Sequence, residues 1–142
     1  MMTDISLEMQ KTLISKAHEM QKFSYIPYVK FAVGAALLTE DGEIYTGCNI
    51  QNAALSPNIC AERTAIFKAV SEGRTKFRAI AVVGGPDREI GDFCYPCGVC
   101  RQVMVEYCDP RSFIIITANS EGDIRTSTLE ELLPESFGPN SL

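Results

Sequence analysis

The sequence lacks the features that mark membrane-bound, secreted and nucleic-acid-binding proteins. No apolar run approaches the ~20 residues that a membrane-spanning helix needs. The N-terminus has no basic segment followed by an apolar one, so no secretion signal is indicated. The net charge is −5, and the chain has no cluster of lysine and arginine that would match a phosphate backbone. We therefore expect neither a membrane nor a nucleic acid as a partner.

Histidine is nearly absent, whereas cysteine is frequent. The only histidine, His18, falls in an amphipathic helical pattern and far in sequence from every cysteine, so we interpret it as a boundary residue and not a ligand. Six cysteines without a secretion signal point to a reducing compartment. Metal ligation then explains the cysteine pairs better than a disulfide framework does. We expect a cytoplasmic protein.

The rest of the composition is that of an ordinary globular protein. The chain has 142 residues, of which 46% are hydrophobic and 22% are charged. This length is enough for one domain with a sizeable core. We expect residues 1–142 to form a single domain.

The spacing of apolar residues predicts an alternation of helices and strands. The expected helices cover residues 6–23, 60–71, 97–107 and a short turn after a capping box at 128–131. The expected strands cover residues 31–39, 43–49, 77–83, 112–117 and 124–127. Strand–helix–strand steps within a sheet are almost always right-handed parallel crossovers. The order therefore predicts an α/β fold, a three-layer α/β/α sandwich with a mixed five-stranded sheet.

Two short stretches, CAE from Cys60 and PCGVC from Pro96, contain the residues of a zinc site. Each opens a predicted helix at the same edge of the sheet, so Cys60 should lie within reach of Cys97 and Cys100. Catalytic zinc takes three protein ligands and leaves the fourth position to water. Glu62 follows the first ligand by two residues, and a glutamate beside such a water is the usual proton shuttle of a hydrolase.

The other cysteines allow a different reading of the same site. Cys94 could complete a closed site with four cysteine ligands, which would leave Glu62 without a function and predicts no activity. Cys48 and Cys108 are expected to be small buried hydrophobic residues.

Five blocks of the sequence resemble the small cytidine deaminases. They are YIPYVKFAVGAAL (25–37), GCNIQNA (47–53), CAERTA (60–65), PCGVCRQ (96–102) and ELLPESF (131–137), in the family's order. The resemblance implies the same zinc ligands and proton shuttle, with one Zn²⁺ per subunit. It also implies hydrolytic deamination of cytidine and 2′-deoxycytidine in pyrimidine salvage, by a homotetramer with shared active sites.

The charge of such a site is a physical problem that a neighbouring residue must solve. Three thiolates on one zinc ion leave a net charge of −1, which should weaken the acidification of the bound water. Hydrogen bonds to the thiolates draw charge off them. Arg63 matches a family arginine with this role, although it could be a solvated helix residue; Arg101 and Gln102 are weaker candidates.

The resemblance implies substrate contacts outside the two cysteine stretches. Phe31 would pack on the pyrimidine, Asn49 would bind the ribose hydroxyls, and the backbone of Ala61 would contact the base. Phe137 would reach the active site of a neighbouring subunit. From the residues alone, Phe31 could belong to the core, Asn49 could cap a turn and Phe137 could fill a surface groove.

Two departures from the family fall in the block that would bind the sugar. The family has glutamate where this chain has Gln51, and commonly Ser-Tyr where it has Ala54-Leu55. An amide in place of a carboxylate loses a charge-assisted hydrogen bond, about 1 kcal/mol, and adds a donor that suits another acceptor. Gln51 is thus a candidate substrate contact, and Gln51→Glu should raise the specificity constant for cytidine. The alternatives are a modified nucleoside or cytosine-containing antibiotic as substrate, or a non-catalytic zinc-binding module.

Overall fold

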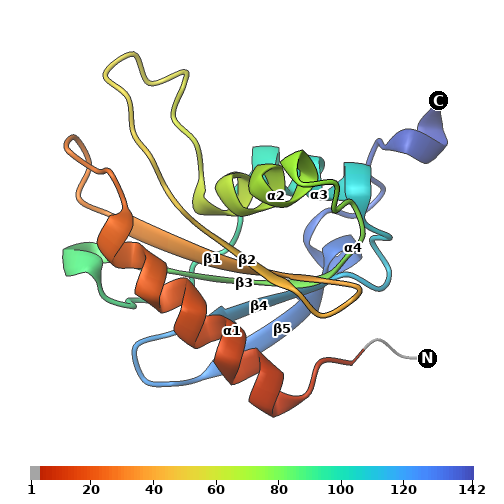
Figure 1. The fold of residues 1–142 in the computed structure, drawn as a ribbon, viewed down its shortest axis with the longest axis horizontal. Helices are drawn as coiled ribbons and strands as arrows, with labels where there is room; N and C mark the ends of the chain where they lie inside the picture. The colour runs from red at the N-terminus through yellow and green to blue at the C-terminus, as the bar shows by residue number, and fades with distance from the viewer. Residues whose placement is uncertain (1–3) are drawn as a thin grey trace.

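The structure, a computed structural model, describes residues 4–142 and contains a mixed five-stranded sheet, as predicted (Figure 1). The strand order is β2-β1-β3-β4-β5. β1 pairs antiparallel with both β2 and β3, β3 pairs parallel with β4, and β4 pairs antiparallel with β5. The strands are β1 (Ala32–Thr39), β2 (Ile44–Cys48), β3 (Phe77–Gly85), β4 (Ile114–Ala118) and β5 (Ile124–Thr128).

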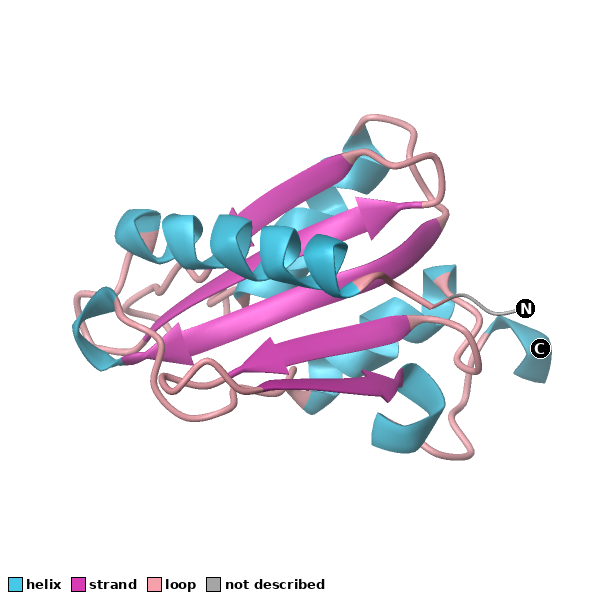
Figure 2. Cartoon of the chain, turned by 90° about the horizontal axis from the view of Figure 1, so that it is seen from below, coloured by secondary structure: helices cyan, strands magenta, loops and turns pink. Residues whose placement is uncertain are grey.

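Helices cover both faces of the sheet and make the three layers that the sequence predicted. α1 (Leu7–Met20) crosses one face, as Figure 2 shows, and continues into a 3₁₀ turn at Gln21–Phe23. α2 (Ala61–Ser71) and α3 (Gly98–Tyr107) lie on the other face, side by side in Figure 1, with the short α4 (Leu129–Leu132) beyond them. Two further 3₁₀ turns cover Pro86–Arg88 and Pro139–Ser141.

The core lies in two layers, one on each face of the sheet. Alternate residues of the central strands point to opposite faces, so β3 contributes to both layers. Ile80 and Val82 pack toward α2 and α3, whereas Ala79 and Ala81 pack toward α1. Cys48 and Cys108 are buried, as predicted for small hydrophobic residues. Among the described residues, no helix combines the length and apolar character that a membrane crossing requires.

A glycine lets α1 pack directly on the sheet. A Cβ atom built on Gly34 of β1 would lie 1.8 Å from the carbonyl oxygen of Ala17 in α1. No side chain fits in that space, so the backbone of the helix and that of the strand are in contact. The small residue at position 34 thus lets α1 approach the strand closely.

The two crossovers bring the starts of α2 and α3 to one end of the sheet. β2 and β3 run in the same direction because both are antiparallel to β1, and β3 and β4 are parallel. Each helix begins one residue later than predicted, since Cys60 and Cys97 have extended backbone and are the N-caps. The predicted first residue was therefore wrong by one position in both helices.

Candidate active site

Three cysteine sulfurs meet where α2 and α3 begin. The Sγ atoms of Cys60, Cys97 and Cys100 all lie within 4.8 Å of one another. Cys60 Sγ is 3.6 Å from Cys97 Sγ, and Cys97 Sγ is 3.5 Å from Cys100 Sγ. The structure thus brings together the three cysteines that the sequence selected, although 37 residues separate the first two.

The geometry of these sulfurs suits a zinc ion. Four ligands at ~2.3 Å in a tetrahedron lie roughly 3.8 Å apart, close to the sulfur–sulfur distances in this cluster. Cys94 is not a member of the cluster, which is the one such group of potential ligands in residues 4–142. Three sulfur donors with no fourth protein donor are the ligand set of a catalytic zinc site and not of a closed structural one.

Both helix starts favour thiolates. Cys60 and Cys97 occupy N-cap positions, and neither side chain accepts a capping hydrogen bond. The partial positive charge of each helix N-terminus therefore faces the cluster. A hydrogen bond with Cys100, followed by one from Arg63, lowers the pKa of Cys60 to about 5.

Arg63 contacts the cluster in the way expected of a residue that draws charge from a thiolate. Its Nη2 atom donates a hydrogen bond to Cys60 Sγ over 3.4 Å. Its Nε atom is buried and has no hydrogen-bond partner within residues 4–142. Arg101 instead donates to the carbonyl oxygens of Pro96 and Leu132, both over 2.6 Å, so its hydrogen bonds go to the backbone.

Glu62 is a buried acid with one free oxygen. Its side chain lies in the first turn of α2 and is only 3% exposed. Its Oε1 atom has no hydrogen-bond partner in the described part of the chain. Burial raises the pKa of Glu62 to about 7, and the negative charge of Cys60 adds to this rise. Buried polar atoms are rarely left unpaired, so this oxygen is available to bind a proton, a water molecule or a substrate atom.

Phe31 and Cys94 meet at Gly84, near the end of β3. The Phe31 side chain is 41% exposed, so the alternative of a core residue is wrong. A Cβ atom on Gly84 would lie 2.9 Å from Cys94 Sγ and 3.0 Å from Phe31 Cε2. A side chain at position 84 would therefore push on the Cys94 and Phe31 side chains, and glycine leaves them room to meet.

Asn49 and Gln51 bind the backbone that leads into β1. Asn49 Nδ2 donates to Phe31 O over 2.9 Å, and Asn49 Oδ1 accepts from Val33 N over 2.9 Å. The Gln51 amide makes three hydrogen bonds with the backbone of Tyr28 and Val29. Both side chains thus support the segment that contains Phe31, in addition to any contact with a ligand.

The two remaining candidates differ in exposure. Ala61 is buried as the first residue of α2, directly beside Cys60. Phe137 is 63% exposed, so it does not fill a groove of its own subunit. Its carbonyl oxygen accepts a hydrogen bond from Gln102 Nε2 over 2.8 Å, which ties the C-terminal segment to α3.

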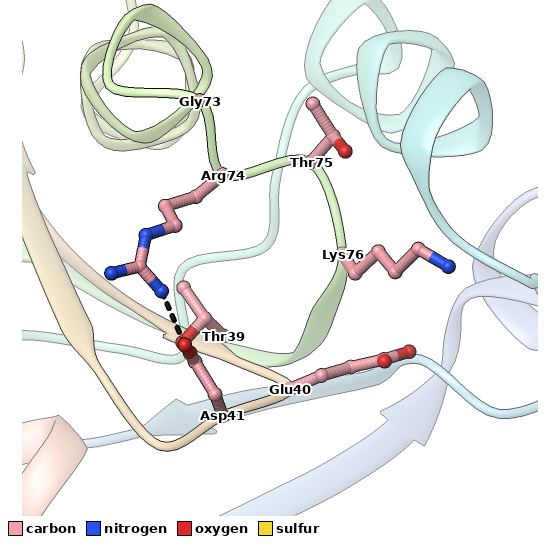
Figure 3. A pocket seen from close by; sticks show the side chains of 7 residues that line it. All are labelled: Thr39, Glu40, Asp41, Gly73, Arg74, Thr75 and Lys76. Carbon is pink, nitrogen blue, oxygen red and sulfur yellow. Dashed lines mark hydrogen bonds and ion pairs between the residues drawn. The ribbon is translucent and has the colours of Figure 1, made fainter.

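A separate pocket of about 320 Å³ lies beyond the other end of α2 (Figure 3). Its lining contains no thiol, and Arg74 within it pairs with Asp41 and with Glu43. Figure 3 shows Arg74 turned toward Asp41, so its charge is already matched. This pocket is distinct from the cysteine cluster and holds none of the predicted site residues.

The chain is similar to known deaminases over most of its length. Residues 7–116 match the family described as the cytidine and deoxycytidylate deaminase zinc-binding region. The cytidine deaminase of Sporosarcina psychrophila is 48% identical over 130 residues, covering 92% of each chain. The blasticidin-S deaminase of Bacillus cereus is 37% identical over 116 residues, 78% of this chain and 80% of that protein. The crystal structure of cytidine deaminase from Burkholderia pseudomallei superposes with a TM-score of 0.82 at 40% identity, covering 94% of this chain and 100% of that one.

Proposed function

The chain belongs to the cytidine and deoxycytidylate deaminase family, and from this premise we propose that it hydrolyses the amino group of cytidine and 2′-deoxycytidine. The products are uridine or 2′-deoxyuridine and ammonia. The observation that carries this proposal is the arrangement of three sulfurs within 4.8 Å beside a buried carboxyl group. A structural zinc site would need the sulfurs but not the acid.

Cys60, Cys97 and Cys100 would hold the zinc ion. When bound, Zn²⁺ lowers the pKa of a water molecule and so supplies a nucleophile near neutral pH. Two helix N-termini and the Arg63 guanidinium face the sulfurs, and they would offset the net negative charge of three thiolates on one divalent ion. The zinc ion would therefore keep more of its ability to acidify a bound water than three unassisted thiolates would leave it.

Glu62 would move the protons of the reaction. Its carboxyl group accepts one proton from the attacking water and passes it to the ring nitrogen, while the water oxygen bonds to the amidine carbon. The second proton of that water passes through Glu62 from the new hydroxyl group to the exocyclic amine, the carbonyl forms as the carbon–nitrogen bond breaks, and ammonia leaves. Burial raises the pKa of Glu62 to about 7. Both protonation states are then accessible near neutral pH, which suits a group that accepts and donates in turn.

The base and the sugar would contact residues that surround this centre. The exposed ring of Phe31 would stack on the pyrimidine, and the backbone at Ala61 would contact its edge. Asn49 and Gln51 lie next to Phe31 and would bind the sugar. Exposed Phe137 would enter the site of a neighbouring subunit. We accordingly propose a single-domain subunit, a homotetramer with shared active sites, and a cytoplasmic role in pyrimidine salvage.

A second candidate keeps the chemistry but changes the substrate. Gln51 and Leu55 replace the family's sugar-binding glutamate and tyrosine. The chain is also similar to a blasticidin-S deaminase over 116 residues. Another aminopyrimidine compound, such as a modified nucleoside or a cytosine-containing antibiotic, is therefore the alternative substrate.

A substrate panel tests both candidates. Ammonia release is measured with cytidine, 2′-deoxycytidine, cytidine monophosphate, cytosine and blasticidin S, and zinc content is measured in the same preparation. We expect one zinc ion per chain and the largest specificity constant for a free nucleoside. A larger constant for blasticidin S would favour the alternative. One bound zinc with no ammonia from any compound would overturn both and leave a non-catalytic zinc-binding module.

A further inference from the structure

We propose that Gln51 is a positioning residue, whose amide holds the loop of residues 28–31 in the shape that presents Phe31 to the base. This inference rests on the proposed function, because that function gives Phe31 a pyrimidine base to bind. It goes beyond that proposal in assigning the side-chain oxygen and one N–H of Gln51 to the protein's own backbone, which leaves only the second N–H of the amide for a sugar.

Gln51 makes three hydrogen bonds with the loop, two through its side-chain oxygen and one through its side-chain nitrogen. Its Oε1 atom accepts from Tyr28 N over 3.0 Å and from Val29 N over 3.1 Å. Its Nε2 atom donates to Val29 O over 2.8 Å. Both lone pairs of the side-chain oxygen are then used, so this oxygen has no acceptor left for a sugar hydroxyl.

Asn49 binds the same stretch of backbone as Gln51 does. Residues 49 and 51 are two positions apart in an extended segment, so their side chains lie on the same side. Asn49 binds the carbonyl oxygen of Phe31 and the N–H of Val33. Two side-chain amides thus bind the backbone of residues 28–31, which precede β1, and of Val33 at the start of that strand. The N–H of Phe31 donates to Val29 O over 2.8 Å, so one carbonyl serves both Gln51 and the chain at Phe31.

The loop has few other contacts to hold it. The side chains of Tyr28 and Val29 are exposed, so apolar packing contributes little there. Lys30 Nζ donates to the carbonyl oxygens of Ile26 and Pro27, both over 3.3 Å, which closes the loop on itself but does not attach it to another element. The Gln51 amide therefore provides the side-chain attachment of residues 28 and 29.

Only an amide can make this set of hydrogen bonds. The loop offers two N–H donors on one side and one carbonyl oxygen on the other, which fixes the orientation of the amide. A carboxylate could accept from Tyr28 and Val29, but it would place a second oxygen against the Val29 carbonyl. Glutamate at position 51 should therefore loosen the loop, which is the opposite of the gain in cytidine binding that the sequence suggested.

The test compares Gln51→Glu and Gln51→Ala with the wild type and with Gln10→Glu as a matched control. Gln10 Nε2 also donates to a backbone carbonyl, that of Ile5, but belongs to α1. Three quantities are measured on the zinc-loaded protein: the kinetic constants for cytidine, the inhibition constant of cytosine, and amide hydrogen exchange at Tyr28 and Val29.

We expect both Gln51 variants to raise the KM for cytidine and the inhibition constant of cytosine by a similar factor, roughly three- to tenfold, with a smaller change in kcat. Exchange at Tyr28 and Val29 should become several-fold faster, and Gln10→Glu should match the wild type in all three. A Gln51→Glu variant with a higher specificity constant for cytidine, or with unchanged cytosine inhibition, would overturn the proposal. If the wild type deaminates nothing, the proposed function fails, but the exchange measurement still decides whether Gln51 holds the loop.

Discussion

Replacing Glu62 with glutamine should remove the activity and, in the zinc-free protein, change how stability depends on pH. The substitution keeps the shape of the side chain but removes its charge and its ability to take a proton. Glu62 is 3% exposed, and burial raises its pKa from 4.5 to about 7. The folded zinc-free protein therefore binds this proton more tightly than the unfolded chain does.

The sign and size of the stability effect follow from this pKa. A carboxyl group whose pKa is raised in the folded state makes the free energy of unfolding fall as pH rises from about 4.5 to about 7. At 1.36 kcal/mol per pKa unit, the total loss is about 3 kcal/mol. Glutamine does not titrate, so the variant escapes the loss. The stability of the variant relative to the wild type should thus improve by about 2 to 3 kcal/mol between pH 5 and pH 8.

The assay is urea unfolding at pH 5 and pH 8, with chelator and reductant present. The difference between proteins removes most of the titration of Cys60, because both proteins contain that thiol; what remains is the mutual effect of the Cys60 and Glu62 charges, which belongs to the burial of Glu62 beside that thiol. Glu106→Gln is the matched control, because it makes the same change of side chain at an exposed residue of α3. In parallel, the zinc-loaded Glu62→Gln variant should keep its metal and lose about 10² to 10⁴ in kcat.

Two results would refute this reasoning. A stability difference that stays constant between pH 5 and pH 8 would mean that Glu62 is solvated or paired in solution. Retained turnover in the variant with full zinc content would remove Glu62 from the proton transfers. The two readouts are independent, so the burial and the catalytic role can fail separately.

Three further substitutions test the surroundings of the site and the packing of the sheet. Arg63→Gln removes the hydrogen bond to Cys60 Sγ, and zinc affinity measured by chelator competition should fall about 10- to 100-fold; an unchanged affinity would show that the contact does not tune the metal. Gly34→Ala forces a methyl group against Ala17 O and should lower the melting temperature or prevent folding, whereas Gly91→Ala, with no atom nearer than 3.5 Å, should not; equal melting temperatures would contradict the backbone contact. Cys94→Ala should leave one zinc ion per chain by elemental analysis, and loss of the metal would reinstate a fourth cysteine ligand.

The sequence was sufficient for the parts of the fold and site that depend on local spacing. Apolar runs predicted the central strands β1, β3 and β4, and the turns before them predicted the less buried strands β2 and β5. Cys97 and Cys100 are three residues apart, and Glu62 follows Cys60 by two, so each half of the cluster is visible in a single stretch. The crossover rule then brought the two halves to one end of the sheet.

What the sequence did not reveal depends on irregular backbone or on three segments meeting. The hydrogen bonds of Gln51 require the path of residues 28–29, which no periodic pattern specifies. The close approach of Phe31 and Cys94 to Gly84 was hidden because these two residues come from two other segments. The exact helix starts were also missed, since an N-cap cysteine is an unusual residue at a position where serine, threonine, aspartate or asparagine is common.

The distance in sequence between Cys60 and Cys97 would make a bound zinc ion a link between two parts of the fold. An ion held by both residues joins two points that lie 37 positions apart and belong to different crossovers of the sheet. Such an ion binds the folded cluster and not the unfolded chain, so its binding free energy would add to the free energy of unfolding. The zinc ion would then act as a reversible cross-link between α2 and α3, so metal supply would set the stability of the folded protein as well as its activity.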